Sequence, residues 1–116
     1  LGDAIEAFNQ AIAMAPDYAD AYASLAEVLR DQGRYDESVD NFKKALELDP
    51  DLPIANYSLA VYYYDSGDLA QALNYFERSQ AADWQERSLY CLYKTGRFEE
   101  FKVGLEKVLM HIPTRT

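Results

Sequence analysis

The sequence predicts an all-α protein built as a solenoid of antiparallel helix pairs, with about seven helices in all. The first observation is a fixed period. Gly33 and Gly67 lie 34 residues apart, and phenylalanines recur at the same interval as Phe8, Phe42 and Phe76. The second is that apolar residues between these markers recur every three or four positions, the pattern of helices with one buried face. A period of this length is typical of stacked repeats, in which each unit packs only on its neighbours.

Residues 2–15 are predicted to form the first helix, which Pro16 ends. Only the second half of a repeat is present in residues 1–18, so one side of this helix lacks its usual cover. We expect either further repeats before this helix or another chain to cover that apolar face. It is therefore a candidate surface for self-association, and it consists of Leu1, Ile5, Phe8 and Ile12.

Residues 19–52 form the first complete unit, with helices predicted over 19–32 and 35–48. Gly33 separates the two helices because glycine readily adopts the positive φ that a helix C-terminus requires. The residues expected to face inward are Tyr22, Leu25, Ala26 and Leu29 from the first helix, and Tyr35, Val39, Phe42, Ala45 and Leu46 from the second.

Residues 53–81 form the next unit, with helices predicted over 53–66 and 69–81 around Gly67. Pro53 suits a first helical turn. The first of these helices is the most aromatic in the chain, and three of its tyrosines are consecutive, at positions 62 to 64. Since neighbours on a helix point about 100° apart, at least one of the three must face away from the core of its own unit.

Residues 82–113 are predicted to form a divergent terminal helix pair, over 84–94 and 97–111, followed by a tail at 114–116. The period shortens here, because Gly96 follows Gly67 after only 29 residues. Phe101 stands where the earlier units have a small residue, and Gly104 lies in the middle of a helix. We expect altered packing in this unit rather than lost structure, since terminal repeats are commonly atypical.

The spacing of these residues resembles the tetratricopeptide repeat (TPR), whose motif is W-x2-L-G-x2-Y, then A-x3-F, then P, over 34 residues. The first complete unit matches with Tyr22, Leu25, Ala26, Leu29, Ser38, Phe42, Ala45 and Pro50. The next matches with Asn56, Leu59, Ala60, Tyr63, Ala72 and Phe76, and the N-terminal half-unit with Ala4, Phe8, Ala11 and Pro16. The resemblance implies a right-handed superhelix whose concave groove is lined mainly by the first helix of each pair.

The resemblance also indicates which residues line that groove. In the first complete unit they are Asp20, Ala23, Ser24, Glu27, Arg30 and Asp31, and in the next unit Asp65 is among them. The later units supply an apolar and aromatic surface with cations at one end, and these are the expected peptide-binding residues: Ile54, Tyr57, Ser58, Val61, Tyr64, Arg87, Tyr90, Tyr93 and Lys94. Tyr57 and Tyr64 are the expected energetic anchors, because buried tyrosines often dominate interfaces. The alternative is that both rings only pack against neighbouring helices.

Two known TPR binding modes find no support in this lining. Chaperone-binding TPRs hold a terminal carboxylate with a clamp of Lys, Asn and Arg, whereas the clamp positions here hold Ala23, Glu27, Ile54 and Ser58. TPRs like those of O-GlcNAc transferase carry an asparagine ladder, at positions occupied here by Ser24 and Ser58. We therefore expect a partner other than a carboxylate-tailed chaperone.

Composition narrows the function further. The formal net charge of −9 argues against nucleic acid as a partner. No apolar run is long enough for a membrane span, and the single cysteine, Cys91, fits a reducing, cytoplasmic location. With one histidine, His111, and no nucleotide-binding or hydrolase motif, we expect no enzyme activity, no metal site and no cofactor.

The expected function is non-enzymatic: a scaffold that binds a peptide or partner helix in the groove. One alternative is homo-oligomerisation, through the N-terminal helix or the divergent C-terminal unit. Another is an accessory module of a larger bacterial-type enzyme, whose activity would lie outside these residues.

Overall fold

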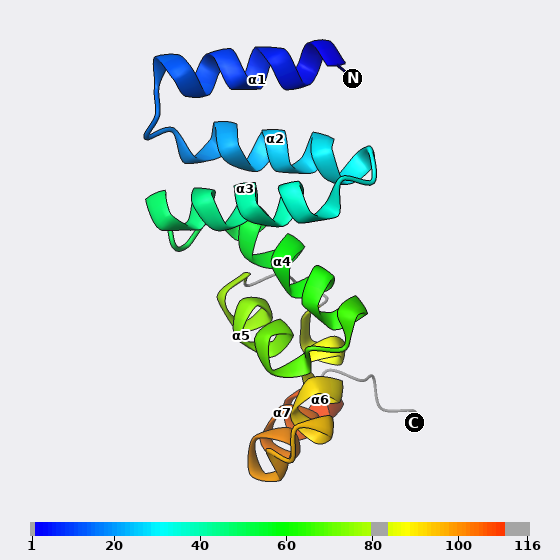
Figure 1. Ribbon diagram of the computed structural model, residues 1–116. Coiled ribbons are helices and arrows are strands. Elements are labelled where there is room, and N and C mark those ends of the chain that lie inside the picture. The colour runs from blue at the N-terminus through cyan, green and yellow to red at the C-terminus, as the bar shows by residue number, and fades with distance from the viewer. Residues whose placement is uncertain (1, 80–83, 111–116) are drawn as a thin grey trace, which may run out of the picture.

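The computed structural model describes residues 2–79 and 84–110, and this part of the chain contains helices and no strand. The elements are α1 (Gly2–Met14), α2 (Ala19–Asp31), α3 (Tyr35–Leu48), α4 (Pro53–Ser66), α5 (Leu69–Ser79), α6 (Trp84–Lys94) and α7 (Phe98–Met110) (Figure 1). The molecule is elongated, with extents of 56 × 29 × 24 Å. The prediction of an all-α helical-repeat solenoid is confirmed.

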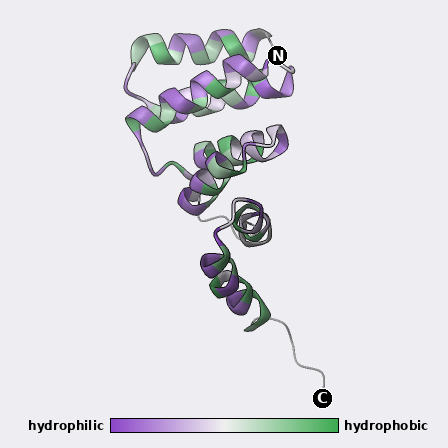
Figure 2. Ribbon diagram, turned by 60° about the horizontal axis from the view of Figure 1, so that its bottom comes forward, coloured by the Kyte–Doolittle hydropathy of each residue, from purple (hydrophilic) through white to green (hydrophobic). Residues whose placement is uncertain are grey.

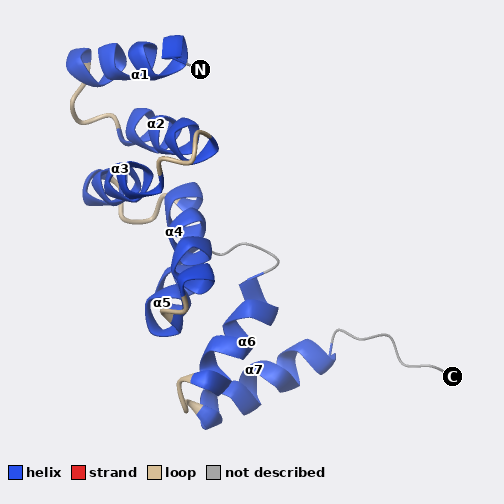
Figure 3. Cartoon of the chain, turned by 45° about the vertical axis from the view of Figure 1, so that its right-hand side comes forward, coloured by secondary structure: helices blue, strands red, loops and turns tan. Residues whose placement is uncertain are grey.

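Each helix packs on the helix before it and the helix after it. The closest packing is within the pairs α2–α3 and α4–α5, and extensive contacts otherwise join only helices adjacent in the sequence. Figures 1 and 3 show the resulting stack, with α1 at one end and the α6–α7 pair at the other. Apolar and polar residues share most of these helices (Figure 2), as in helices that turn one face to the core and one to solvent.

The three turns within the helix pairs have the same backbone geometry. Gly33, Gly67 and Gly96 have φ values of 79°, 88° and 80°. In each turn the residue after the glycine donates its N–H to a carbonyl five residues earlier, at 2.9 Å; the bonds are Arg34 to Leu29, Asp68 to Tyr63 and Arg97 to Leu92. These bonds are typical of helices that end at a left-handed glycine. They also set the register of the last pair, in which Leu92 is equivalent to Tyr63 and Leu29.

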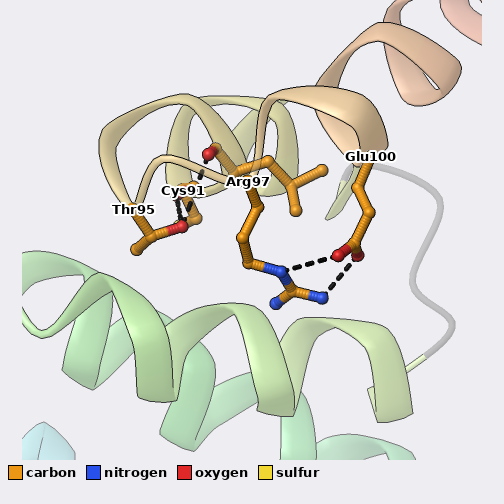
Figure 4. Close-up of polar contacts among 5 residues, drawn as sticks. Cys91, Thr95, Arg97 and Glu100 are labelled. Carbon is orange, nitrogen blue, oxygen red and sulfur yellow. Dashed lines mark hydrogen bonds and ion pairs between the residues drawn. The ribbon is translucent and has the colours of Figure 1, made fainter.

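A side-chain pair follows each turn, between the residue after the glycine and the residue three positions later. Arg34 Nε donates to Glu37 at 3.0 Å, and Gln71 Nε2 donates to Asp68 at 3.1 Å. Figure 4 shows the third pair, in which Arg97 donates both Nε, at 2.9 Å, and Nη2 to the Glu100 carboxylate. The same figure shows Thr95 Oγ1 donating to the Cys91 carbonyl at 2.7 Å, which closes the end of α6.

Two apolar clusters hold the stack together. The first joins α2, α3 and α4 around Phe42, and the second joins α4, α5 and α6 around Phe76. Ala26 and Ala60 are fully buried at equivalent positions, where their small side chains let the second helix of each pair approach closely. Because each cluster spans two units, the units depend on each other for their cores.

Asn56 stands where the motif has a tryptophan, and it performs a different task. Its side chain is fully buried, and Nδ2 donates to the carbonyls of Pro50 at 3.0 Å and Leu52 at 3.3 Å. Asn56 Oδ1 is buried and accepts no hydrogen bond from the described residues. The amide therefore ties the α3–α4 connection to the first turn of α4.

Some details differ from the sequence-based expectations. Tyr35 was expected in the buried stripe of its helix but is 56% exposed, because it lies at the first residue of α3. In α7 no described side chain is buried, and Leu105 is 37% exposed although the equivalent Phe42 and Phe76 are 2% and 0% exposed. Phe42 and Phe76 are covered by the helix that follows their own pair. Leu1, the boundary at 81–82, His111 and the tail at 114–116 lie outside the described residues.

We expect Gly67→Ala to lower the free energy of unfolding by about 1 kcal/mol, because an L side chain is strained at this positive φ although no atom obstructs it. Gly67→Asn should cost less, since asparagine tolerates the left-handed region. Urea denaturation followed by circular dichroism measures both. Equal stability of Gly67→Ala and the wild type would contradict this account of the turn.

We expect Asn56→Asp to lower the free energy of unfolding by about 3 kcal/mol at neutral pH, because a buried carboxylate would face two carbonyl oxygens. Burial raises the folded-state pKa of such a carboxyl group. Stability should therefore be highest below the unfolded-state pKa, and it should fall as the pH rises from the unfolded-state pKa to the folded-state pKa. Asn74→Asp, on the exposed face of α5, is the matched control and should shift stability by less than about 0.5 kcal/mol.

Candidate functional site

A pocket of about 380 Å³ opens where α4 meets the end of α2 and the start of α3. Its walls combine aromatic rings, one aliphatic side chain, hydroxyl groups and two opposite charges: Arg30, Tyr35, Tyr57, Ser58, Val61, Tyr62, Asp65 and Ser66. The pocket joins two successive repeats, so it exists only because the turns and cores fix their relative position.

Contacts with neighbouring side chains fix the position of Arg30 in this pocket. Arg30 Nη1 donates to Ser58 Oγ at 3.2 Å, and the Arg30 guanidinium lies 6.0 Å from the centre of the Phe42 ring. Asp31 adds an exposed ion pair to Arg30 at 3.8 Å. Asp65 is exposed on the last turn of α4. A ligand in the pocket would therefore meet an oriented cation and a separate carboxylate.

The structure brings five of the expected groove residues together in this pocket, namely Arg30 of α2 and Tyr57, Ser58, Val61 and Asp65 of α4. Ile54 is exposed on the same helix but does not line it. Three pocket residues were missing from the groove expected from sequence, namely Tyr35, Tyr62 and Ser66. The sequence did contain an indication for Tyr35 and Tyr62. Tyr35 is the first residue of α3, and one of the three consecutive tyrosines had to point outward.

The other expected residues form a separate row of rings and cations across α4 and α6. The Arg87 guanidinium lies 5.7 Å from the centre of the Tyr64 ring, and that ring lies 5.9 Å from the ring of Tyr90. Lys94 Nζ in turn lies 5.9 Å from the Tyr90 ring centre. Alternating cations and rings attract one another, which orders this otherwise exposed surface. Tyr93 turns toward α7, where it contacts Phe98 and Phe101.

Tyr57 and Tyr64 both contribute to the core. Each meets Phe76 edge-on, with ring centres 6.2 Å apart, and each is only half-buried. Replacing either ring would therefore disturb the packing of α4 on α5 as well as any bound partner. Residues at the rim of the pocket give cleaner tests of binding.

The titratable groups with shifted pKa values lie away from the pocket. A hydrogen bond with Tyr63 raises the pKa of Lys43, and burial raises the pKa of the Cys91 thiol, which is unpaired. Within residues 2–79 and 84–110, no group of three or more His, Cys, Asp and Glu side chains could hold a metal ion. None of the described helices is long and apolar enough to cross a membrane.

The surface suggested for self-association is only partly open. Ile5, Phe8 and Ile12 are half-buried in α1, which packs on α2. More apolar surface is exposed at the other end of the stack, where Val103, Leu109 and Met110 of α7 are all more than half exposed.

Three family models match the sequence. One described as TPR repeat covers residues 26–67, and two described as tetratricopeptide repeat cover residues 1–39 and 54–83. Together with the repeated helix pairs and equivalent turns, these matches define a helical-repeat protein of the kind used for protein–protein interaction. The chain belongs to the tetratricopeptide repeat family.

Solved structures agree on the fold. The TPR protein YrrB, whose crystal structure is described as having an unusual peptide-binding site, is 22% identical with a TM-score of 0.73, over 91% of this chain and 57% of that one. MamA is 20% identical with a TM-score of 0.70, over 94% of this chain and 69% of that one. The chain thus spans little more than half the length of YrrB. No curated protein matches the sequence.

We expect the Cys91 thiol of the folded protein to react with iodoacetamide roughly 100-fold more slowly than that of the urea-unfolded chain, because reaction requires local opening of α6. The raised pKa acts in the same direction, since only the thiolate attacks. Mass spectrometry of timed samples measures both rates. Equal rates would show that the core formed by α4, α5 and α6 opens freely.

Proposed function

We propose that the chain binds a peptide or helix of a partner protein in its groove, as a scaffold without enzyme activity of its own. The observation that carries the proposal is the pocket between α2, α3 and α4, with Tyr57, Ser58 and Val61 on one side and Arg30 opposite Ser58. Binding pockets of this kind combine apolar walls with a few oriented polar groups.

The pocket is suited to one large apolar side chain of the partner. Its tyrosines and valine supply apolar contact, and rigid tyrosines contribute area at low cost in conformational entropy. Arg30 and Asp65 at its edge supply a donor and an acceptor for the partner's backbone or for its charged neighbours. Together they favour a polypeptide with an apolar anchor over a wholly charged ligand.

The row of rings and cations begins on α4, which also lines the pocket, and reaches α6. Tyr90 is exposed beside Lys94, and Arg87 lies on Tyr64, so an acidic part of the same partner would find cations there. The α2 side carries carboxylates instead, at Asp20, Glu27 and Asp31. We infer that the partner segment has its basic end on α2 and its acidic end on α6. The peptide-binding site named for YrrB supports a peptide ligand by analogy.

A second candidate function is homotypic assembly through α7. No described residue of this helix is buried, and Leu105, Leu109 and Met110 present apolar surface to solvent. Exposed apolar surface of this kind marks interaction sites. A molecular mass that rises with protein concentration would favour assembly, whereas a constant monomer mass would leave peptide binding as the function.

The groove proposal can be tested with peptides selected from a displayed random library on the immobilised chain. We expect Tyr35→Ala to weaken binding of a selected peptide about tenfold, because the ring lines the pocket while remaining 56% exposed. Fluorescence anisotropy measures the dissociation constant, and circular dichroism checks the fold. Asp65→Lys should weaken binding of the same peptide, because it replaces the carboxylate at the rim of the pocket with a cation.

Two matched controls accompany these variants. Tyr18→Ala removes a similarly exposed tyrosine at the start of α2, and Asp51→Lys reverses an exposed charge in the α3–α4 connection. Neither residue lines the pocket. If the controls weaken binding as much as the test variants, or if all four bind like the wild type, the groove is not the site.

A further inference from the structure

A second cleft, of about 450 Å³, lies between α5, α6 and α7 and shares no lining residue with the groove pocket. Its floor is largely apolar and its rim is charged: Glu77, Ser88, Leu89, Leu92, Glu99, Glu100, Val103, Gly104 and Lys107. Nothing in the proposed groove function uses these residues.

The preceding helices show what normally fills such a cleft. In the equivalent place between α3, α4 and α5, the rings of Tyr63 and Tyr75 stack with centres 5.7 Å apart and planes within 5°. Lys43 of α3 lies over this stack, with Nζ 5.7 Å from the Tyr63 ring centre. That site is therefore closed by two aromatic rings under one cation, all from the chain itself.

The equivalent turns at Gly67 and Gly96 allow the two clefts to be compared residue by residue. Leu92 occupies the position of Tyr63, and Gly104 occupies the position of Tyr75. Leu89 replaces the small Ala60 and takes part of the vacated space, since a Cβ on Gly104 would lie only 2.8 Å from Leu89 Cδ2. Two rings are lost and two isobutyl groups, those of Leu89 and Leu92, are gained, so the cleft lacks aromatic volume.

The charge changes in the same comparison. Glu77 of α5 stands where Lys43 stands in α3, while Glu99 and Glu100 stand where Ala70 and Gln71 stand. Arg97 pairs with Glu100 and lies close enough to Glu77 to interact with it, and Lys107 also lines the cleft. Three carboxylates thus face two cations. The position that holds the Lys43 ammonium group at the site between α3, α4 and α5 holds the Glu77 carboxylate at the cleft between α5, α6 and α7.

We propose that this cleft binds an aromatic side chain flanked by lysine or arginine on a partner polypeptide. The ring would replace the stacked tyrosines on the floor of Leu89, Leu92 and Val103, and the flanking cation would meet Glu77 and Glu99. The partner would thereby supply the ring and the cation that Tyr75 and Lys43 supply at the site between α3, α4 and α5. A ring flanked by acids would place like charges together on this rim.

The test uses the chain of residues 1–116, labelled with ¹⁵N, and three short peptides with blocked ends. The first carries a tyrosine between two arginines, the second an alanine between two arginines, and the third a tyrosine between two glutamates. We expect only the first to shift the amide signals of Leu89, Leu92, Val103 and Gly104 in a saturable titration. Shifts caused equally by all three peptides, or by none, would overturn the proposal.

Two variants sharpen this test. Glu99→Lys should weaken binding of the arginine–tyrosine–arginine peptide about fivefold, whereas Glu106→Lys, an exposed residue of α7 that does not line the cleft, should not. The triple change Leu89→Ala, Leu92→Tyr and Gly104→Tyr introduces the side chains of Ala60, Tyr63 and Tyr75 at the equivalent positions. This triple variant should abolish the peptide-induced shifts, while its circular dichroism spectrum should remain that of a helical protein.

If the triple variant fails to fold, Val103→Lys serves in its place, because Val103 lies at the cleft and is more than half exposed. Peptide-induced shifts that survive in this folded variant would overturn the proposal. So would shifts that map to Tyr57, Ser58 and Val61 instead. Tyr35→Ala should leave binding at this cleft unchanged, so failure of the groove proposal would be seen separately.

Discussion

The whole stack depends on the backbone turn within each helix pair. A glycine with positive φ ends the first helix, and the next residue bonds back to a carbonyl five positions earlier. Because the geometry is the same at Gly33, Gly67 and Gly96, each second helix returns along the same face of its partner. The alanines at the helix crossings, the phenylalanines of the cores and both clefts inherit their positions from that one conformation.

Between pairs, the controlling interaction is burial of one large ring by the helix that follows. Phe42 packs among residues of α2 and α4, and Phe76 is contacted by Tyr57 and Tyr64 within a cluster that extends to α6. Tyrosines needed for this packing also border the groove, so stability and recognition share side chains on α4. The exposed Tyr35 and Asp65 are where the two roles separate.

Much of the fold could be predicted because its determinants are local. Helical periodicity, turn glycines and the 34-residue period gave seven helices, most with ends within a residue of those in the structure. The sites could not be predicted as fully. The spacing assigns Tyr35 to the buried face, although as the first residue of α3 it is exposed in the structure. The cleft at Gly104 appears only when Leu89 and Leu92 are compared in space with Ala60 and Tyr63. Such effects come from the combined volume of residues on different helices, which periodicity does not contain.

The restriction of contacts to neighbouring helices gives the molecule graded cooperativity. In a linear stack, one end can open while the remainder stays folded, and the pair with the least buried surface opens most often. Neither α1 nor α7 has a buried residue among those described, so the α6–α7 pair is the weakly held part at the C-terminal end of the stack. Opening it would erase the cleft beside Gly104 but leave the pocket around Ser58 intact. The two surfaces would then have different lifetimes, and occupancy of the C-terminal one would act as a clamp on the end of the array.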